Sequence, residues 1–157
     1  MAIIRISGNH GAGKTTLTTQ LSKILGYEHV YTGAIFRALA EKNNQSIESY
    51  YAALKNDPER EKELDNAQAT LMQTKDNLVV EGRMAPFQPS PFKTVNVLLT
   101  VTLEEGAKRI HRENPEKYPS TKAAKQASRE RYGSEQERFR LLYGIENFLD
   151  TKHFDLV

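Results

Sequence analysis

The sequence of 157 residues contains no cysteine, which excludes disulfide bonds and thiolate metal sites and fits a reducing cytoplasm. No apolar run approaches the roughly 20 residues that a membrane-spanning helix needs. No basic segment followed by a long apolar core marks a secretory signal. The formal net charge of +2 is too small to predict DNA or RNA binding. We therefore expect a cytoplasmic protein without membrane or nucleic-acid partners.

Strand and helix patterns alternate along the chain, whose content of 38% hydrophobic and 27% charged residues is typical of a globular domain. Apolar runs typical of strands occupy 2–7, 28–31, 77–82, 95–101 and 153–157. Helices are predicted at 14–25, from 34, from 58, at 103–112 and in a charged segment that ends near 144. This alternation predicts one α/β domain over residues 1–157 with a mainly parallel sheet.

The segment between the first strand and the first helix is rich in glycine and matches the phosphate-binding pattern G-x-x-x-x-G-K-[ST]. In such a loop, backbone N–H groups and the helix N-terminus surround an anion. The residues predicted to bind a nucleoside triphosphate are Gly8, Asn9, His10, Gly11, Ala12, Gly13, Lys14, Thr15 and Thr16. We expect Lys14 to reach the β- and γ-phosphates, Thr15 to bind Mg²⁺, and His10 to offer only its backbone N–H. A glycine turn without a ligand is the alternative, and the absence of an N-K-x-D motif favours ATP over GTP.

Two arginines follow predicted strands, where open α/β sheets bind ligands. Arg37 lies one helical turn beyond the loop that follows the second strand, and Thr32 of that loop supplies a hydroxyl. Arg83 follows Glu81 at the end of the third strand. A hydroxyl acceptor of a phosphoryl group usually needs a carboxylate base, whereas a phosphate acceptor needs cations. The arginines therefore favour a phosphate acceptor, with surface salt bridges as the alternative. Glu81 either holds Mg²⁺ through water, contacts substrate or positions a water in an ATPase.

The charged segment near the C-terminus carries four arginines among glutamates: Arg129, Arg131, Arg138 and Arg140. On a solvated helix, such residues normally form only i,i+4 ion pairs. Beside Gly133, a candidate hinge, they also suit a mobile lid that brings positive charge onto a transferring phosphoryl group. We expect at least one of Arg131 and Arg138 to act in this way.

Together these segments resemble the nucleoside monophosphate kinases, and specifically cytidylate kinases of the short archaeal type, over the whole chain. "YTGAIFRALAE" (31–41) resembles the acceptor motif (S/T)-G-x-I-(F/Y)-R, and "VVEGR" (79–83) resembles the strand whose arginine meets the acceptor. "RYGSEQERFRLLYGI" (131–145) resembles the lid stretch R-x-x-S-E-x-x-R-(Y/F), which selects Arg131 and Arg138 over the other two arginines.

The resemblance implies a three-layer P-loop NTPase fold with a five-stranded parallel sheet, a helical acceptor-binding insert at about 34–76 and a helical lid at about 112–140. It implies ATP and Mg²⁺ as cofactors and phosphorylation of CMP or dCMP. The implied acceptor-binding residues are Thr32, Gly33, Arg37, Glu81 and Arg83; the metal ligands are Thr15 and Glu81; the catalytic residues are Lys14, Arg83, Arg131 and Arg138.

Base selection and the acceptor itself are less specified by these motifs. Gln68 is a candidate for contacting the base, and a monomer is expected. Alternatives are a kinase for AMP, UMP or a small phosphorylated metabolite, and a non-catalytic ATP-binding protein. An RNA-associated ATPase is suggested only by the isoelectric point of about 8.8.

Overall fold

A computed structural model describes residues 2–46, 49–50, 53 and 57–157 of the chain. Strands and helices alternate, which confirms the α/β class. The strands are β1 (Ala2–Gly8), β2 (Glu28–Tyr31), β3 (Leu78–Glu81) and β4 (Lys93–Leu99). The helices are α1 (Lys14–Leu25), α2 (Thr32–Lys42), α4 (Pro58–Thr74), α5 (Leu103–Glu113) and α6 (Thr121–Tyr143), with short 3₁₀ helices η1 (Ala85–Phe87) and η2 (Thr151–His153).

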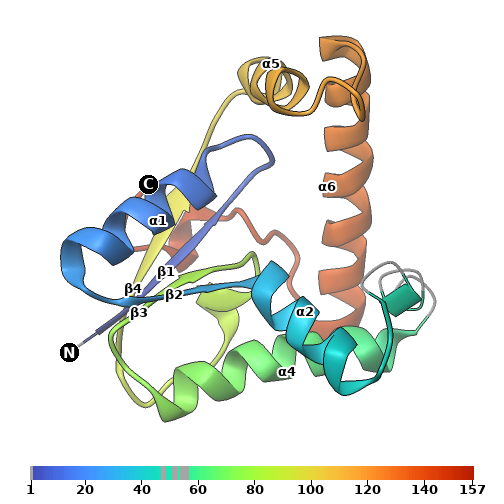
Figure 1. The fold of residues 1–157 in the computed structure, drawn as a ribbon. Coiled ribbons are helices and arrows are strands. Elements are labelled where there is room, and N and C mark those ends of the chain that lie inside the picture. The colour runs from blue at the N-terminus through green and yellow to red at the C-terminus, as the bar shows by residue number, and fades with distance from the viewer. Residues whose placement is uncertain (1, 47–48, 51–52, 54–56) are drawn as a thin grey trace.

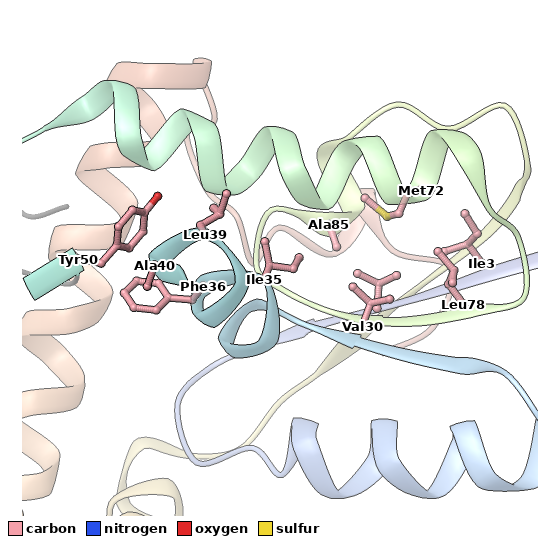
Figure 2. Close-up of a cluster of buried hydrophobic side chains, with 11 residues drawn as sticks. Ile3, Val30, Ile35, Phe36, Leu39, Ala40, Tyr50, Met72, Leu78 and Ala85 are labelled. Atoms are coloured by element: carbon pink, nitrogen blue, oxygen red, sulfur yellow. The ribbon is translucent and has the colours of Figure 1, made fainter. Parts of the chain in front are cut away.

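The four strands form a parallel sheet in the order β2-β3-β1-β4. Ile6 of β1 lies beside Glu81 of β3 on one side and Val97 of β4 on the other. The blue helix α1 and the green helix α4 lie on opposite sides of the strands (Figures 1 and 2), so the sheet is the middle of three layers. Because the strands are parallel, β1, β2 and β3 end at the same edge, at Gly8, Tyr31 and Glu81. Helix α6 stands beside this edge (Figure 1).

The fifth strand that the sequence predicts is reduced to one parallel bridge between Val97 and Leu156, so the described part of the chain has four strands rather than five. The main chain still runs beside β4, since Leu98 N donates to Leu156 O at 2.9 Å and Asp155 N donates to Asn96 O at 2.8 Å. The Asp155 carboxylate accepts the Asn96 N–H at 2.7 Å. This side-chain bond occupies the donor that a longer ladder would use.

The helix boundaries follow capping residues. Asp57 accepts two backbone N–H groups of the first turn of α4, and Pro58 occupies that turn, as the sequence predicts. The Thr102 side chain accepts the Glu105 N–H at 3.2 Å and caps α5. Helix α2 begins at Thr32, two residues before the predicted start at 34. The Thr32 hydroxyl therefore lies in the first turn of this helix.

The main hydrophobic core lies between the sheet, α2 and α4 (Figure 2). Ile35, Phe36 and Leu39 of α2 are buried in it, as their spacing predicts. They pack with Val30 of β2 and Met72 of α4. Burial of each large apolar side chain contributes about 1.5–3 kcal/mol. This core fixes α2 and α4 beside the edge where the strands end.

Two smaller clusters fix α6. At its N-terminal end, Ala124 packs with Ala107 and Ile110 of α5. At its C-terminal end, Phe139 packs with Met84 and Phe148. Between these clusters the helix continues unbroken through Gly133, the candidate hinge. Hinge motion at this residue stays a prediction.

None of the described helices is both long enough and apolar enough to cross a membrane.

Candidate active site

The phosphate loop connects β1 to α1 in a backbone shape that glycine favours. Gly8 has φ +149°, and a Cβ there would lie 2.0 Å from the Leu99 carbonyl oxygen of β4. The Asn9 side chain ties the loop to the chain after β4, because it donates to Val101 O at 2.6 Å and accepts Val101 N–H at 3.2 Å. These contacts hold the loop open towards the edge of the sheet. The Asn9 side chain thus has a structural role, and only the backbone of this residue remains to bind a ligand.

Lys14 begins α1 and folds back over the loop. Its ammonium group donates to Gly8 O at 3.0 Å and to Asn9 O at 2.8 Å. Burial, together with the positive charge of Arg83, lowers the pKa of Lys14 to about 8. The lysine therefore lies where the sequence predicts, beside the anion-binding loop.

His10 contacts α6 through its side chain, a contact that the sequence did not indicate. Its Nδ1 lies 3.1 Å from Ser128 Oγ. Burial, and then the charge of Arg131, lowers the pKa of His10 to about 4, so the imidazole is neutral at pH 7. The loop and α6 are therefore in direct contact.

A second contact joins the loop to α5, where two glycines meet. A Cβ on Gly11 would lie 2.6 Å from Gly106 O, and a Cβ on Gly106 would lie 2.8 Å from His10 O. Gly11 also has φ +77°, which L side chains rarely adopt. Glycine at both positions allows α5 to support the loop, and nothing in the sequence pattern marked Gly106.

Thr15 and Glu81, the two predicted metal ligands, are brought together because β1 and β3 are neighbours. Thr15 Oγ1 donates to Glu81 Oε1 at 3.0 Å, and Thr18 Oγ1 donates to Glu81 Oε2 at 3.3 Å. His29 Nε2 lies 3.9 Å from the same carboxylate. Within the described residues, no group of three or more histidine, aspartate or glutamate side chains could hold a metal ion alone. The hydroxyl and the carboxylate are hard oxygen ligands of the kind that Mg²⁺ takes beside substrate phosphates.

The predicted acceptor motif opens α2. Thr32 Oγ1 donates to Glu81 O at 3.4 Å, and Thr32 and Gly33 line the cleft described below. Arg37 is exposed and turned towards Tyr31: its guanidinium donates to the Tyr31 hydroxyl and lies 5.5 Å from the ring centroid. Tyr31 lines the cleft and Arg37 does not. The structure therefore places Arg37 behind Tyr31 at the cleft margin.

Arg83 and Arg131, predicted from segments far apart in the sequence, meet at Glu135. Glu135 Oε1 accepts Arg83 Nη1–H at 2.7 Å and Arg131 Nε–H at 2.9 Å. Burial lowers the pKa of Arg83 to about 10, and the charge of Glu135 opposes this shift. The sequence pattern places Glu135 in the lid stretch without indicating a role for it.

The other lid arginines lie apart from this cluster. Arg138 also lines the cleft, with its guanidinium 4.9 Å from the Phe139 ring centroid. Arg129 and Arg140 are exposed, and neither lines the cleft. The two arginines that the lid spacing selects are thus the two that line the cleft.

These elements surround one large cleft of about 1390 Å³. Its wall contains most of the predicted site residues: His10, Gly11, Gly13, Lys14, Thr15, Thr16, Thr32, Gly33, Glu81, Arg83, Arg131 and Arg138. Gly8, Asn9, Ala12 and Arg37 do not line it.

Polar side chains of α4 also line the cleft. Gln68 is 3% exposed and donates to Glu81 O at 3.3 Å. Asp65, which the sequence did not single out, accepts the Tyr143 hydroxyl at 2.5 Å, and burial raises its pKa. Asp65 and Gln68 both line the cleft, as the phosphate loop does.

Known proteins similar in sequence share almost the whole chain. The AAA domain family matches residues 4–134. The cytidylate kinase of Thermoplasma acidophilum is 34% identical over 154 residues, which cover 98% of this chain and 81% of that protein. The cytidylate kinase of Haloarcula marismortui is 35% identical over 155 residues, covering 98% and 78%. That of Ignicoccus hospitalis is 34% identical over 157 residues, covering 100% and 88%.

Solved structures share the fold at lower identity. An uncharacterized protein from Eubacterium ventriosum superposes with a TM-score of 0.71 at 12% identity, covering 99% of this chain and 86% of that one. Shikimate kinase from Acinetobacter baumannii superposes with a TM-score of 0.55 at 19% identity, covering 89% and 78%. The fold and the phosphate loop thus define a P-loop kinase domain. Because these relatives match almost the whole of this chain at 34–35% identity, the chain belongs to the cytidylate kinase family.

Proposed function

We propose that the protein transfers the γ-phosphoryl group of ATP to CMP or dCMP, forming ADP and CDP or dCDP. The observation that carries the proposal is the meeting of a phosphate loop, a hydroxyl–carboxylate pair and two arginines around one cleft. The names of its relatives, cytidylate kinases, support the choice of acceptor. The names of the relatives do not favour another acceptor, and a non-catalytic nucleotide-binding role is not favoured because the cleft carries groups for both phosphates.

The phosphate loop and Lys14 bind the donor. Backbone N–H groups of the loop and of the first turn of α1 surround the β- and γ-phosphates. Lys14 exchanges its carbonyl partners, at 2.8–3.0 Å, for phosphate oxygens. Thr15 and Glu81 fit Mg²⁺ as oxygen ligands, and the ion would neutralise phosphate charge.

The acceptor phosphate binds at the edge where β2 and β3 end. Thr32 and Gly33 offer the N-terminus of α2, and Arg83 offers a guanidinium from the end of β3. Arg37 reaches the same phosphate after leaving Tyr31. A phosphate acceptor needs these cations and no general base.

The cytosine base binds against α4. Its exocyclic amine donates to the Asp65 carboxylate, whereas uracil presents a carbonyl oxygen at the same position and is repelled. Gln68 lies one helical turn along the same helix in the cleft wall and offers an amide to the base. Polar groups that must be paired discriminate strongly between such substrates.

Arg131 and Arg138 serve the transferring phosphoryl group from α6. Phosphoryl transfer depends on positioning and on neutralisation of charge more than on covalent chemistry. Closure of α6 over the cleft excludes water, so ATP hydrolysis without an acceptor is slow.

The test is ADP formation from ATP and Mg²⁺ with CMP, dCMP, UMP, AMP or GMP supplied separately. A rate that rises only with CMP or dCMP supports the proposal. Stimulation by a different monophosphate keeps the mechanism and replaces the substrate. If none stimulates while ATP still binds, the protein is a nucleotide-binding protein without transfer activity.

A further inference from the structure

Glu135 occupies the point where Arg83, assigned above to the acceptor phosphate, meets Arg131, assigned to the transferring phosphoryl group. Arg83 comes from the end of β3, and Arg131 lies one helical turn before Glu135 on α6. The side chains of Arg83 and Glu135 are only 13% and 11% exposed. The contact therefore joins the end of the sheet to α6 in the wall of the cleft.

The geometry of this cluster differs from that of a closed ion pair. One oxygen, Glu135 Oε1, takes both hydrogen bonds. Glu135 Oε2 and Arg83 Nε are buried and have no hydrogen-bond partner among the described residues. A fork-to-fork arginine–carboxylate pair uses both oxygens and two N–H groups, and buried polar groups are normally paired. The two guanidinium groups instead meet at a single oxygen atom, as they would at one phosphate oxygen.

The unpaired atoms belong to residues that line a second cavity, of about 410 Å³, behind the cleft. Arg83, Arg131 and Glu135 line both the cavity and the cleft. The cluster thus separates the cavity from the cleft. Because open space lies on both sides of these side chains, they have room for small rotations.

The surrounding charge explains why an anion is needed here. Lys14, Arg83, Arg131 and Arg138 bring positive charge to the cluster, and Glu81 and Glu135 are the acidic groups that act on Lys14 and Arg83. Without Glu135, the largely buried guanidinium of Arg83 would face the half-exposed guanidinium of Arg131 with no anion between them. Leaving buried charges uncompensated is strongly unfavourable.

We propose that Glu135 is an internal counter-ion that holds Arg83 and Arg131 in place for the acceptor phosphate and the transferring phosphoryl group, and that these phosphate groups replace it when nucleotides bind. Glu135 is a positioning residue, since it does not touch the reacting atoms. When products leave, Glu135 again accepts the N–H groups of Arg83 and Arg131. The two guanidinium groups are therefore never left without an anion. The proposal rests on the function proposed above, which gives the arginines their phosphoryl ligand.

The test is Glu135→Gln, which removes the charge and keeps the shape. The variant is expected to bind inorganic pyrophosphate at least about 5-fold more tightly, because the competing anion is gone. Product release then slows, so kcat and the KM for ATP fall together. Glu135→Asp keeps the charge on a shorter side chain and is expected to give an intermediate pyrophosphate affinity. Thermal unfolding of each variant reports on folding separately.

Glu130→Gln is the matched control. Glu130 lies on the same helix, is exposed and accepts Gln126 Nε2–H at 2.7 Å. The substitution removes the same charge from α6 without changing a partner of Arg83. It therefore measures how far the loss of one negative charge on this helix alone alters pyrophosphate affinity. Pyrophosphate affinities of E135Q and E135D that do not exceed that of E130Q overturn the proposal, as does a lowered melting temperature as the sole effect. Pyrophosphate binding needs no acceptor, so this result is independent of whether CMP is the substrate.

Discussion

Gly106→Ala tests whether α5 supports the phosphate loop. Gly106 is buried in the first turn of α5, and an added Cβ would lie 2.8 Å from the His10 carbonyl oxygen and 3.2 Å from Val101 Cγ1. The nearer atom is backbone and cannot rotate away. The phosphate loop must therefore move by some tenths of an ångström, and its N–H groups move with it.

The expected magnitude comes from two opposing terms. Replacing glycine by alanine in a helix favours folding by about 1 kcal/mol. Forcing an extra methyl group into a close contact disfavours it by about 1–3 kcal/mol. Gly133→Ala in α6 is the matched comparison, because no atom lies within 4 Å of its added Cβ. Gly133→Ala is thus expected to raise the melting temperature by about 2–4 °C, while Gly106→Ala leaves it unchanged or lowers it.

Thermal unfolding of both variants and calorimetry of ADP binding to Gly106→Ala measure these effects. We expect ADP affinity to fall about 10-fold in Gly106→Ala, equivalent to about 1.4 kcal/mol of lost backbone contacts. A Gly106→Ala protein as stable as Gly133→Ala, with unchanged ADP affinity, would refute the claim that the loop rests on α5.

Three further predictions address single groups of the site. Lys14→Ala and Arg37→Ala are each expected to lower kcat/KM at least about 100-fold, because charge neutralisation drives phosphoryl transfer; steady-state rates near wild type would count against both roles. The unfolded chain takes up a proton near pH 6.5 whereas folded His10 does so near 4, so wild-type stability falls as the pH drops through this range. His10→Gln is expected to remove about 1–3 kcal/mol of that loss in urea unfolding, and an identical pH profile would contradict the burial argument. Asp65→Asn is expected to raise the UMP-to-CMP ratio of kcat/KM about 10-fold or more, since an amide donates to the uracil carbonyl, and an unchanged ratio would exclude Asp65 from base selection.

Local rules account for the parts of the fold that the sequence predicted. The strand at the N-terminus, the glycine loop and the caps at Asp57 and Thr102 depend on neighbours a few residues away, and each lies where its pattern indicates. The fifth strand, predicted at 153–157, is reduced to one bridge because the side chain of Asp155, within that segment, accepts a backbone N–H of β4. A hydrophobic run cannot reveal that competition.

In the candidate site, too, the sequence indicated what depends on local patterns and missed what depends on contacts between distant segments. Lys14 and Thr15 were predicted from the spacing of the phosphate-loop pattern and Glu81 from its place at the end of a predicted strand, and all three line the cleft. Glu135 was missed because its role depends on Arg83, 52 residues earlier in the sequence, reaching α6 from the end of β3. Gly106 was missed because it matters only by having no side chain where α5 contacts the phosphate loop, which is distant in the sequence. Such contacts exist only once the sheet order is known.

The most direct test of the central claim follows the γ-phosphoryl group itself. The protein is incubated with ATP labelled at the γ-phosphate, Mg²⁺ and CMP, and the labelled products are separated. The account predicts that the label appears in CDP, with little inorganic phosphate, and that Lys14→Ala abolishes the transfer. Label that appears only as inorganic phosphate, or stays in ATP while CMP is bound, would contradict it.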